Sequence, residues 1–181
     1  MKGKQTSASK VTKTEVVCPN DTNPVGILKG GVLVQWMDIA AAVTSQTHSE
    51  KICVTASIDK VNFHAPARNG DIMIIESNVT RAFTTSMEIY AEAFRKKIED
   101  GSLEEVASAY FTFVALDKNG KPASVPALIP STTEENLRYD GALQRARMSR
   151  QTQIFPFCHA VKLLREADYV TVSSNEYEGT P

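Results

Sequence analysis

The sequence predicts an α+β domain in which a curled antiparallel sheet wraps around one long central helix. From Val32 to Val43 only Gln35 and Asp38 are polar. A helix that is apolar on every face is either buried or spans a membrane. A span needs about 20 apolar residues, and the polar residues 44–48 end this run sooner. Strand-like runs separated by turn dipeptides follow the helix, and this order is typical of an α+β fold.

Composition narrows the class of protein. The chain has 181 residues, of which 42% are hydrophobic and 23% charged, and this is ordinary for one globular domain with a tail. A net charge of −1 argues against general binding to nucleic acid or to a membrane surface. The three cysteines lie far apart without a C-x-x-C pair, which favours reduced thiols in the cytoplasm. No cluster of His and Cys is expected to hold a metal.

The predicted strands follow the helix in chain order, with one strand before it. Residues 86–94 show clear period-two alternation, with Met87, Ile89, Ala91 and Ala93 on one side. Turn pairs such as Asp100-Gly101 separate the strands. The five expected strands cover residues 11–18, 52–63, 72–80, 86–94 and 106–116.

The ends of the chain differ from this central region. Residues 1–10, rich in Lys, Ser and Thr, are expected to be a flexible N-terminus ahead of a domain over 11–130. A capping box at residues 131–134 predicts a C-terminal helix over 131–151. Residues 152–181 form an extra tail of unknown role. Because residues 154–164 of this tail are largely apolar, we expect them to pack on the domain or on a neighbouring subunit.

The start of the central helix has the features of a reactive site. Gly30 and Gly31 let another group approach the backbone closely, and the free N–H groups of a first helical turn can polarise a carbonyl oxygen. Tight packing at the helix entrance explains the two glycines equally well. Asp38, almost two turns further on, favours a site because a carboxylate on a core helix is costly to bury. A structural aspartate bonded to backbone donors remains the alternative.

Five segments together resemble the hotdog-fold acyl-CoA thioesterases over residues 11–150. They are Asn23-Pro-Val-Gly-Ile-Leu-Lys-Gly-Gly31, Trp36-Met-Asp38, Lys60-Val-Asn-Phe-His-Ala-Pro66, Thr85-Ser-Met-Glu-Ile89 and Ala109-Tyr-Phe-Thr-Phe-Val-Ala-Leu116. The chain is most similar to the single-domain bacterial acyl-CoA hydrolases and to the second repeat of the brain-type cytosolic acyl-CoA hydrolases. This resemblance implies hydrolysis of an acyl-CoA thioester to a free fatty acid and CoA, without a cofactor beyond the CoA of the substrate.

The resemblance also implies the site residues. Asn23 matches the family's active-site asparagine, Asp38 its catalytic carboxylate, and Gly31 the helix-start N–H that polarises the thioester carbonyl. The expected substrate-binding residues are Gly30, Phe63, His64, Thr85 and Ser86, the last two on the strand that borders the CoA channel in relatives. Lys29 departs from the family pattern, in which a His or an aromatic residue often precedes the glycine pair.

The residues agree with this chemistry. An ionised Asp38 can act as general base on a water or attack the thioester directly. Gly31 and Asp38 lie about 10 Å apart on one rigid helix, so we expect a homodimer that shares each site between two chains. The resemblance extends this expectation to a hexamer. Two alternatives remain: a non-catalytic module that binds acyl-CoA or a nucleotide, and a structural oligomerisation domain.

Overall fold

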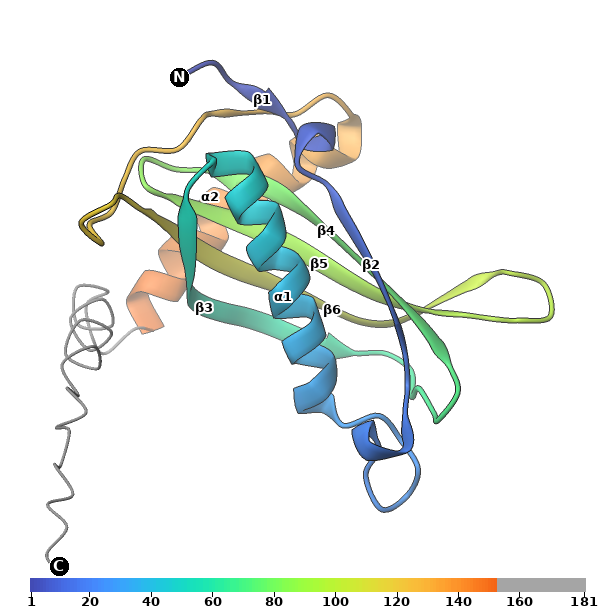
Figure 1. Ribbon diagram of the computed structural model, residues 1–181. Helices are drawn as coiled ribbons and strands as arrows, with labels where there is room; N and C mark the ends of the chain where they lie inside the picture. Colours follow the sequence, from blue (N-terminus) through green and yellow to red (C-terminus); the bar gives the residue numbers. More distant parts are fainter. Residues whose placement is uncertain (153–181) are drawn as a thin grey trace, which may run out of the picture.

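The computed structural model describes residues 1–152, and the side chains of residues 1–148 (Figure 1). The expected tail, from residue 153 on, lies outside the described residues. The main strands are β2 (Val11–Val16), β3 (Ile52–Phe63), β4 (Ile72–Ala82), β5 (Ser86–Lys96) and β6 (Leu103–Leu116). The helices are α1 (Gly30–Ser49) and α2 (Thr133–Thr152). Short elements complete the chain: β1 (Lys4–Gln5), β7 (Leu128–Ile129), and the 3₁₀ turns η1 (Thr6–Ala8) and η2 (Pro19–Asp21).

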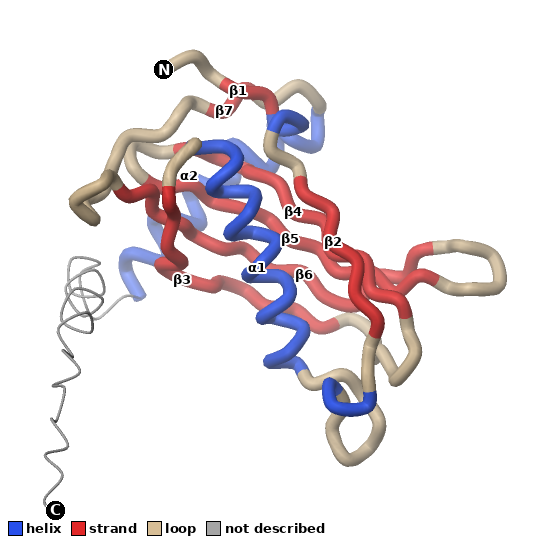
Figure 2. The backbone as a smooth tube through the Cα atoms, viewed as in Figure 1, coloured by secondary structure: helices blue, strands red, loops and turns tan. Residues whose placement is uncertain are grey.

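The five main strands form one antiparallel sheet in the order β2-β4-β5-β6-β3. The sheet curls around α1 on one face, and α2 crosses the opposite face (Figure 2). This arrangement confirms the predicted fold. The strand β3 forms one edge, so its outer row of backbone groups is free to meet another chain.

The core lies between α1 and the inner face of the sheet. The predicted alternation in β5 is confirmed, because Met87, Ile89, Ala91 and Ala93 are all fully buried. From the helix, four apolar residues at positions i, i+4, i+7 and i+8 of one face complete this core: Leu33, Met37, Ala40 and Ala41.

One strip of α1 is not covered by the described residues of the chain. Ile39 keeps 43% of its surface exposed and Val43 46%, and Asp38 is half-buried. Sequence analysis expected Asp38 to be buried together with the rest of the core helix. The structure corrects this prediction. Asp38 lies at the border of the core, toward β3, and the exposed apolar strip next to it is available to a partner.

The N-terminus is ordered, which corrects the expectation of a flexible segment over residues 1–10. β1 pairs in parallel with β7, and η1 follows at once. Thr6 and Ser9 are buried, and the Ser9 hydroxyl bonds His48 at 3.2 Å. Composition alone suggested flexibility, but contacts with residues far along the chain hold the segment in place.

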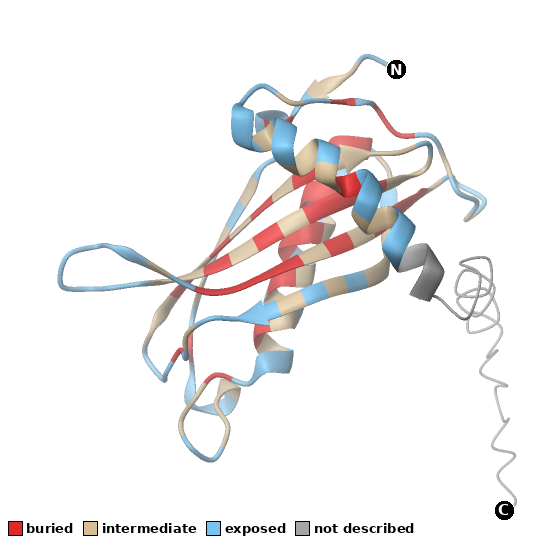
Figure 3. Cartoon of the chain, turned by 180° about the vertical axis from the view of Figure 1, so that it is seen from behind, coloured by how far each residue is buried: buried red, intermediate tan, exposed pale blue. Residues whose placement is uncertain are grey.

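The helix α2 docks on the sheet through arginines more than through apolar side chains. Seen from behind in Figure 3, it runs obliquely over the strands. Arg138 stacks on Tyr90 of β5, and Arg145 stacks on Tyr110 of β6 while pairing with the buried Glu88 at 2.8 Å. Guanidinium groups can cover aromatic faces and bond carboxylates at the same time. A helix of very polar sequence can therefore still be anchored.

Candidate active site

The N-terminus of α1 presents free hydrogen-bond donors. The N–H groups of Val32 and Leu33 both donate to the carbonyl oxygen of Lys29, at 3.1 Å. Those of Gly30 and Gly31 have no partner among the described residues, and no side chain caps this helix end. Because the helix dipole adds partial positive charge here, the two N–H groups can bind a developing oxyanion.

The two glycines have different surroundings. A Cβ atom at Gly30 would lie 3.1 Å from the Phe63 ring, so this glycine allows the ring to rest on the helix end. A Cβ atom at Gly31 would meet nothing within 4 Å among the described residues. Gly30 therefore serves packing inside the chain, whereas Gly31 faces open space from which a ligand can approach.

Asn23 is held in a tight turn just before the helix. Its side-chain oxygen accepts hydrogen bonds from the N–H groups of Val25 and Ile27, both at 3.1 Å. Backbone N–H groups can only donate, so they fix the orientation of the Asn23 amide. The NH₂ end has no partner among the described residues, and it is the part of Asn23 left to donate to a ligand or water.

Asp38 is positioned by a residue that sequence analysis missed. The Thr55 hydroxyl on β3 donates to Asp38 Oδ1 at 2.9 Å. The other carboxylate oxygen has no bonded partner within residues 1–148. The signal that could have identified Thr55 is its period-two spacing from Cys53, the buried residue of the same strand. It was hidden because a register shift between Thr55 and Ser57 breaks the period of two in β3.

Three of the expected substrate-binding residues come together at a cavity. Gly30, Phe63 and His64 line a cavity of about 360 Å³ beside the start of α1. His64 Nε2 lies 3.2 Å from both Ser108 Oγ and Glu105 Oε1, so this nitrogen of the ring is already engaged.

Thr85 and Ser86 lie elsewhere in the chain. Ser86 pairs with Val114, which in turn pairs with Val54 near the start of β3. Phe63 lies at the other end of β3. Within one chain, Thr85 and Ser86 are therefore at the opposite end of the sheet from the glycine pair.

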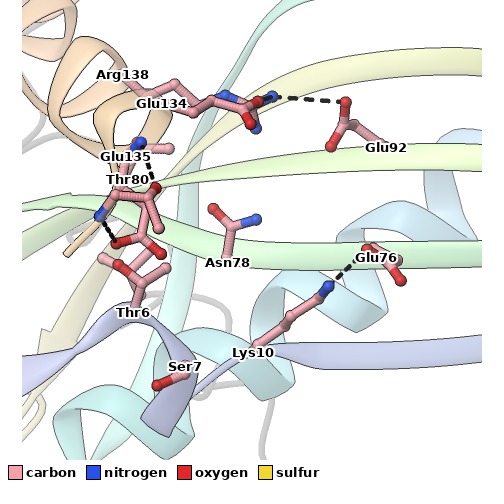
Figure 4. Close-up of a pocket in the computed structure, with 12 residues that line it drawn as sticks. Thr6, Ser7, Lys10, Glu76, Asn78, Thr80, Glu92, Glu134, Glu135 and Arg138 are labelled. Atoms are coloured by element: carbon pink, nitrogen blue, oxygen red, sulfur yellow. Dashed lines mark hydrogen bonds and ion pairs between the residues drawn. The ribbon is translucent and has the colours of Figure 1, made fainter. Parts of the chain in front are cut away.

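A second cavity, of about 270 Å³, lies on the opposite face of the sheet (Figure 4). Its lysine and its arginine are already paired, Lys10 with Glu76 at 2.7 Å and Arg138 with Glu134 at 2.7 Å. Burial raises the pKa of Glu92, which also faces this cavity. With its cations neutralised and carboxylates in excess, this cavity is poorly suited to the phosphates of CoA.

Neither a metal centre nor a membrane span is found in the described part. Within it, no group of three or more His, Cys, Asp or Glu side chains is arranged to hold a metal ion. Neither α1 nor α2, as far as its residues are described, has the length and apolar character needed to cross a membrane.

Comparison with known proteins identifies the family. Residues 25–102 match the thioesterase superfamily. The chain is 41% identical over 138 residues to an uncharacterized acyl-CoA thioester hydrolase of Bacillus subtilis, covering 76% of this chain and 80% of that protein. The chain belongs to the hotdog-fold acyl-CoA thioester hydrolases. It is also 35% identical over 136 residues to the cytosolic acyl coenzyme A thioester hydrolase of Rattus norvegicus, of which it spans only 36%.

Solved structures of family members share the whole fold. The acyl-CoA hydrolase of Staphylococcus aureus, in complex with butyryl-CoA and CoA, matches with a TM-score of 0.78 and 34% identity over 92% of this chain and 97% of that one. A hexameric acyl-CoA thioesterase matches with a TM-score of 0.81 and 33% identity over 86% of this chain and all of that one.

Alanine mutants of the S. aureus hydrolase replace an asparagine, an aspartate and a threonine. In that protein the asparagine lies 15 residues before the aspartate, and the threonine lies 17 residues after it. The same two spacings separate Asn23, Asp38 and Thr55 here.

Proposed function

We propose that this protein hydrolyses acyl-CoA thioesters to a free fatty acid and CoA. The observation that carries the proposal is the Asp38 carboxylate, which Thr55 holds through one oxygen and whose other oxygen has no partner among the described side chains. Family membership and the shared spacing of three polar residues support it. The unpaired Cys18 and Cys53 fit a reducing cytoplasm, which we propose as the compartment.

Each polar group has a proposed step in the reaction. Asp38 takes a proton from the attacking water, or attacks the carbonyl carbon itself to give an anhydride that water then cleaves. The N–H of Gly31 stabilises the oxyanion that forms at the carbonyl oxygen. The NH₂ group of Asn23 donates to the carbonyl or to the water. Collapse of this oxyanion breaks the C–S bond and releases CoA as the thiolate; in the second route this step forms the anhydride, before water cleaves it.

The site is proposed to form between two chains. Gly31 and Asp38 are separated by seven residues of one rigid helix, about 10 Å, too far to act on one carbonyl group. Next to Asp38, Ile39 and Val43 are exposed, and β3 is an unpaired edge that carries the exposed Ile58. A partner chain related by a two-fold axis along this surface covers these apolar side chains, and its helix end approaches the carboxylate of the first chain.

Thr85 and Ser86, remote from the glycine pair within one chain, are proposed to bind the CoA part of the substrate. Assembly into a hexamer is proposed by analogy with the hexameric relative.

Thiol release from a panel of acyl-CoAs tests the activity. Asp38→Asn keeps the shape of the side chain, so we expect it to fold and bind CoA but to lose about 100-fold or more in turnover. Asp59→Asn is the matched control, because Asp59 accepts a hydrogen bond from Ser57 at 2.8 Å on the same strand as Thr55. Normal hydrolysis by folded Asp38→Asn would exclude the mechanism. CoA binding by the wild type without any hydrolysis would favour the non-catalytic module.

Mixing two inactive variants tests the shared site. Asn23→Ala and Asp38→Ala are unfolded together and refolded as an equal mixture. Random pairing makes about half of the dimers mixed, and each mixed dimer has one intact site, so roughly a quarter of wild-type activity should return. A mixture that exchanges subunits and stays inactive would place both residues in one chain's site.

A further inference from the structure

The loop between β2 and α1 carries Asn23, and hydrogen bonds hold its first arm. This arm is the 3₁₀ turn η2, which contains no buried residue, so apolar packing does not fix it. An exposed segment with few buried contacts opens easily unless hydrogen bonds hold it. The position of Asn23 therefore depends on the bonds that this loop makes.

The bonds inside the loop form a small closed turn around Asn23. The Asn23 N–H donates to the carbonyl oxygen of Ile27 at 2.8 Å, and Thr22 pairs with Leu28 at the base of the turn. Together with the two N–H groups that bond the Asn23 side-chain oxygen, they fix the Asn23 amide relative to the turn. None of these bonds joins η2 to the start of α1.

Lys29, where the chain departs from the family pattern, makes that connection. Its backbone N–H donates to the carbonyl oxygen of Asp21 at 2.9 Å, and its Nζ donates to that of Asn20 at 2.6 Å. Both acceptors belong to η2, whereas Lys29 is the N-cap residue of α1. The bond to Asn20 is the only hydrogen bond of this side chain within the described residues.

The helix that follows does not explain the lysine side chain. An N-cap side chain stabilises a helix by accepting a hydrogen bond from a free N–H group, and an ammonium group cannot accept one. Its positive charge also opposes the helix dipole. The contact with Asn20 is therefore the role that the structure supports for Lys29.

We propose that Lys29 is a positioning residue, which holds η2, and with it the turn around Asn23, in place against the start of α1. For turnover, this inference rests on the proposed function. The NH₂ group of Asn23 and the N–H group of Gly31 are proposed to act on a thioester, and a shift of about 1 Å in such a group can cost about 100-fold in rate. Lys29 itself contacts no reacting atom and acts through Asn23.

Thiol release from butyryl-CoA measures the effect on turnover. Lys29→Met keeps most of the apolar stem and removes the donor. We expect kcat to fall about 10-fold, since the backbone bond to Asp21 remains, and KM to stay within about 2-fold. Lys29→Arg keeps a donor at the end of a long side chain, so it should restore kcat to within about 3-fold of wild type. Lys29→Gln, which is uncharged and one bond shorter than lysine, serves if the methionine variant does not fold.

Amide hydrogen exchange, followed by mass spectrometry, measures the positioning without relying on activity. For a peptide that covers residues 18–29, exchange in Lys29→Met should be about 5-fold faster than in the wild type, because η2 opens more often. Lys29→Arg should keep the slow exchange. Lys118→Met is the matched control: it makes the same change at an exposed lysine in the turn after β6, and it should alter neither kcat nor the exchange of this peptide.

The two measurements together decide the inference. Slower turnover with faster exchange in Lys29→Met, both reversed in Lys29→Arg, supports it. Slower turnover with unchanged exchange overturns it and would assign the effect to the charge of Lys29. Normal turnover in folded Lys29→Met also overturns it, and in both cases the proposed activity stands. If the wild type releases thiol from no acyl-CoA, the proposed function fails, and the exchange rates alone then support or overturn the hold of Lys29 on the loop.

Discussion

The two ends of α1 use polar groups in opposite ways. At the C-terminal end, four polar residues are buried, and all of them are hydrogen-bonded: Thr44, Ser45, His48 and Ser49. At the N-terminal end, Gly30 and Gly31 are exposed and their N–H groups have no partner in the described part. A buried polar group without a partner costs free energy. The polar groups at the C-terminal end of α1 are therefore used to stabilise the fold and are not available to a ligand. The exposed donors of the second end remain available to a ligand.

The C-terminal end also fixes two distant segments. His48 Nε2 lies 3.1 Å from the carbonyl oxygen of Pro126, which precedes β7, and Nδ1 lies 3.2 Å from the Ser9 hydroxyl, just after η1. One imidazole thus joins the N-terminal segment and the connection to α2 to the central helix.

The largest expected effect is on stability, at the C-terminal end. His48→Ala removes a fully buried ring and leaves the Pro126 carbonyl and the Ser9 hydroxyl without a partner. We expect the free energy of unfolding to fall by about 3 kcal/mol, measured by denaturant unfolding. Turnover per folded molecule should stay normal well below the unfolding temperature. Thr47→Ala, at the neighbouring exposed helix position, is the control and should change little.

A loss of specific activity in folded His48→Ala would contradict the assignment of stability to the C-terminal end of α1 and of reactivity to its N-terminal end. It would mean that the C-terminal end also shapes the reactive site.

The second-largest effect is expected on catalytic activity, from a substitution at the N-terminal end of α1. The methyl group of Gly31→Ala has no neighbouring atom within 4 Å in the described part of the chain, and alanine improves helix propensity, so the fold should be retained or slightly stabilised. The added methyl group lies where the thioester is proposed to approach, so we expect kcat/KM for butyryl-CoA to fall about 10-fold or more. Gly30→Ala provides the comparison, because its methyl group would press on the Phe63 ring at 3.1 Å. Unchanged activity in Gly31→Ala would show that the substrate approaches from another side.

The buried His48 at the C-terminal end of α1 should also make the stability of the fold depend on pH. Burial lowers the pKa of His48 below its ordinary value of 6.5. Above pH 6.5 the ring is neutral in both folded and unfolded chains. Below it, the unfolded chain takes up a proton that the folded chain resists, so stability falls with pH until the lower folded pKa is reached. The slope in that window is at most about 1.4 kcal/mol per pH unit.

Denaturant unfolding of the wild type and of His48→Gln, from pH 7.5 down to 5, measures this contribution as the difference between the two proteins. The difference should shrink as the pH falls, because glutamine does not titrate. A constant difference would mean that His48 does not carry the acid sensitivity.

The smallest effect on stability is expected at the surface beside the C-terminal end of α1. Lys4 Nζ pairs with Glu50 at 2.7 Å and donates to the Thr47 carbonyl at 3.1 Å. Because Glu50 is largely exposed, solvent and salt screen the pair. Lys4→Ala should lower the unfolding temperature by less than about 3 °C, and high salt should reduce the difference further. A larger shift would show that the β1 segment contributes more to stability than its surface contacts suggest.

The sequence was sufficient where the signal is local. Period-two alternation predicted the buried face of β5, and the apolar run from Val32 predicted the central helix, because each pattern reflects burial of neighbouring residues on one element. Turn dipeptides such as Asp100-Gly101 marked a strand connection correctly. The glycine pair and Asp38 were predicted as site residues from their positions on this helix and from the family resemblance, and that role stays a prediction.

Contacts between distant residues could not be predicted in this way. The partnership of Asp38 with Thr55 depends on the placement of β3 against α1 and on the register shift beside Thr55. The order in residues 1–10 depends on pairing with β7, more than a hundred residues away. The anchoring of α2 depends on arginines meeting tyrosines of β5 and β6.

By itself, then, the sequence determined the fold class, the central helix, and the donors and carboxylate that this helix carries. Only the tertiary structure decided that Asp38 lies at the border of the core, that Gly30 supports Phe63 while Gly31 is open, and that an apolar cavity begins beside them. The physical reason is the distance along the chain over which each kind of interaction acts. Periodicity and turn chemistry act over a few residues, whereas a cavity wall or a hydrogen bond between strand and helix exists only after segments distant in the chain have packed together.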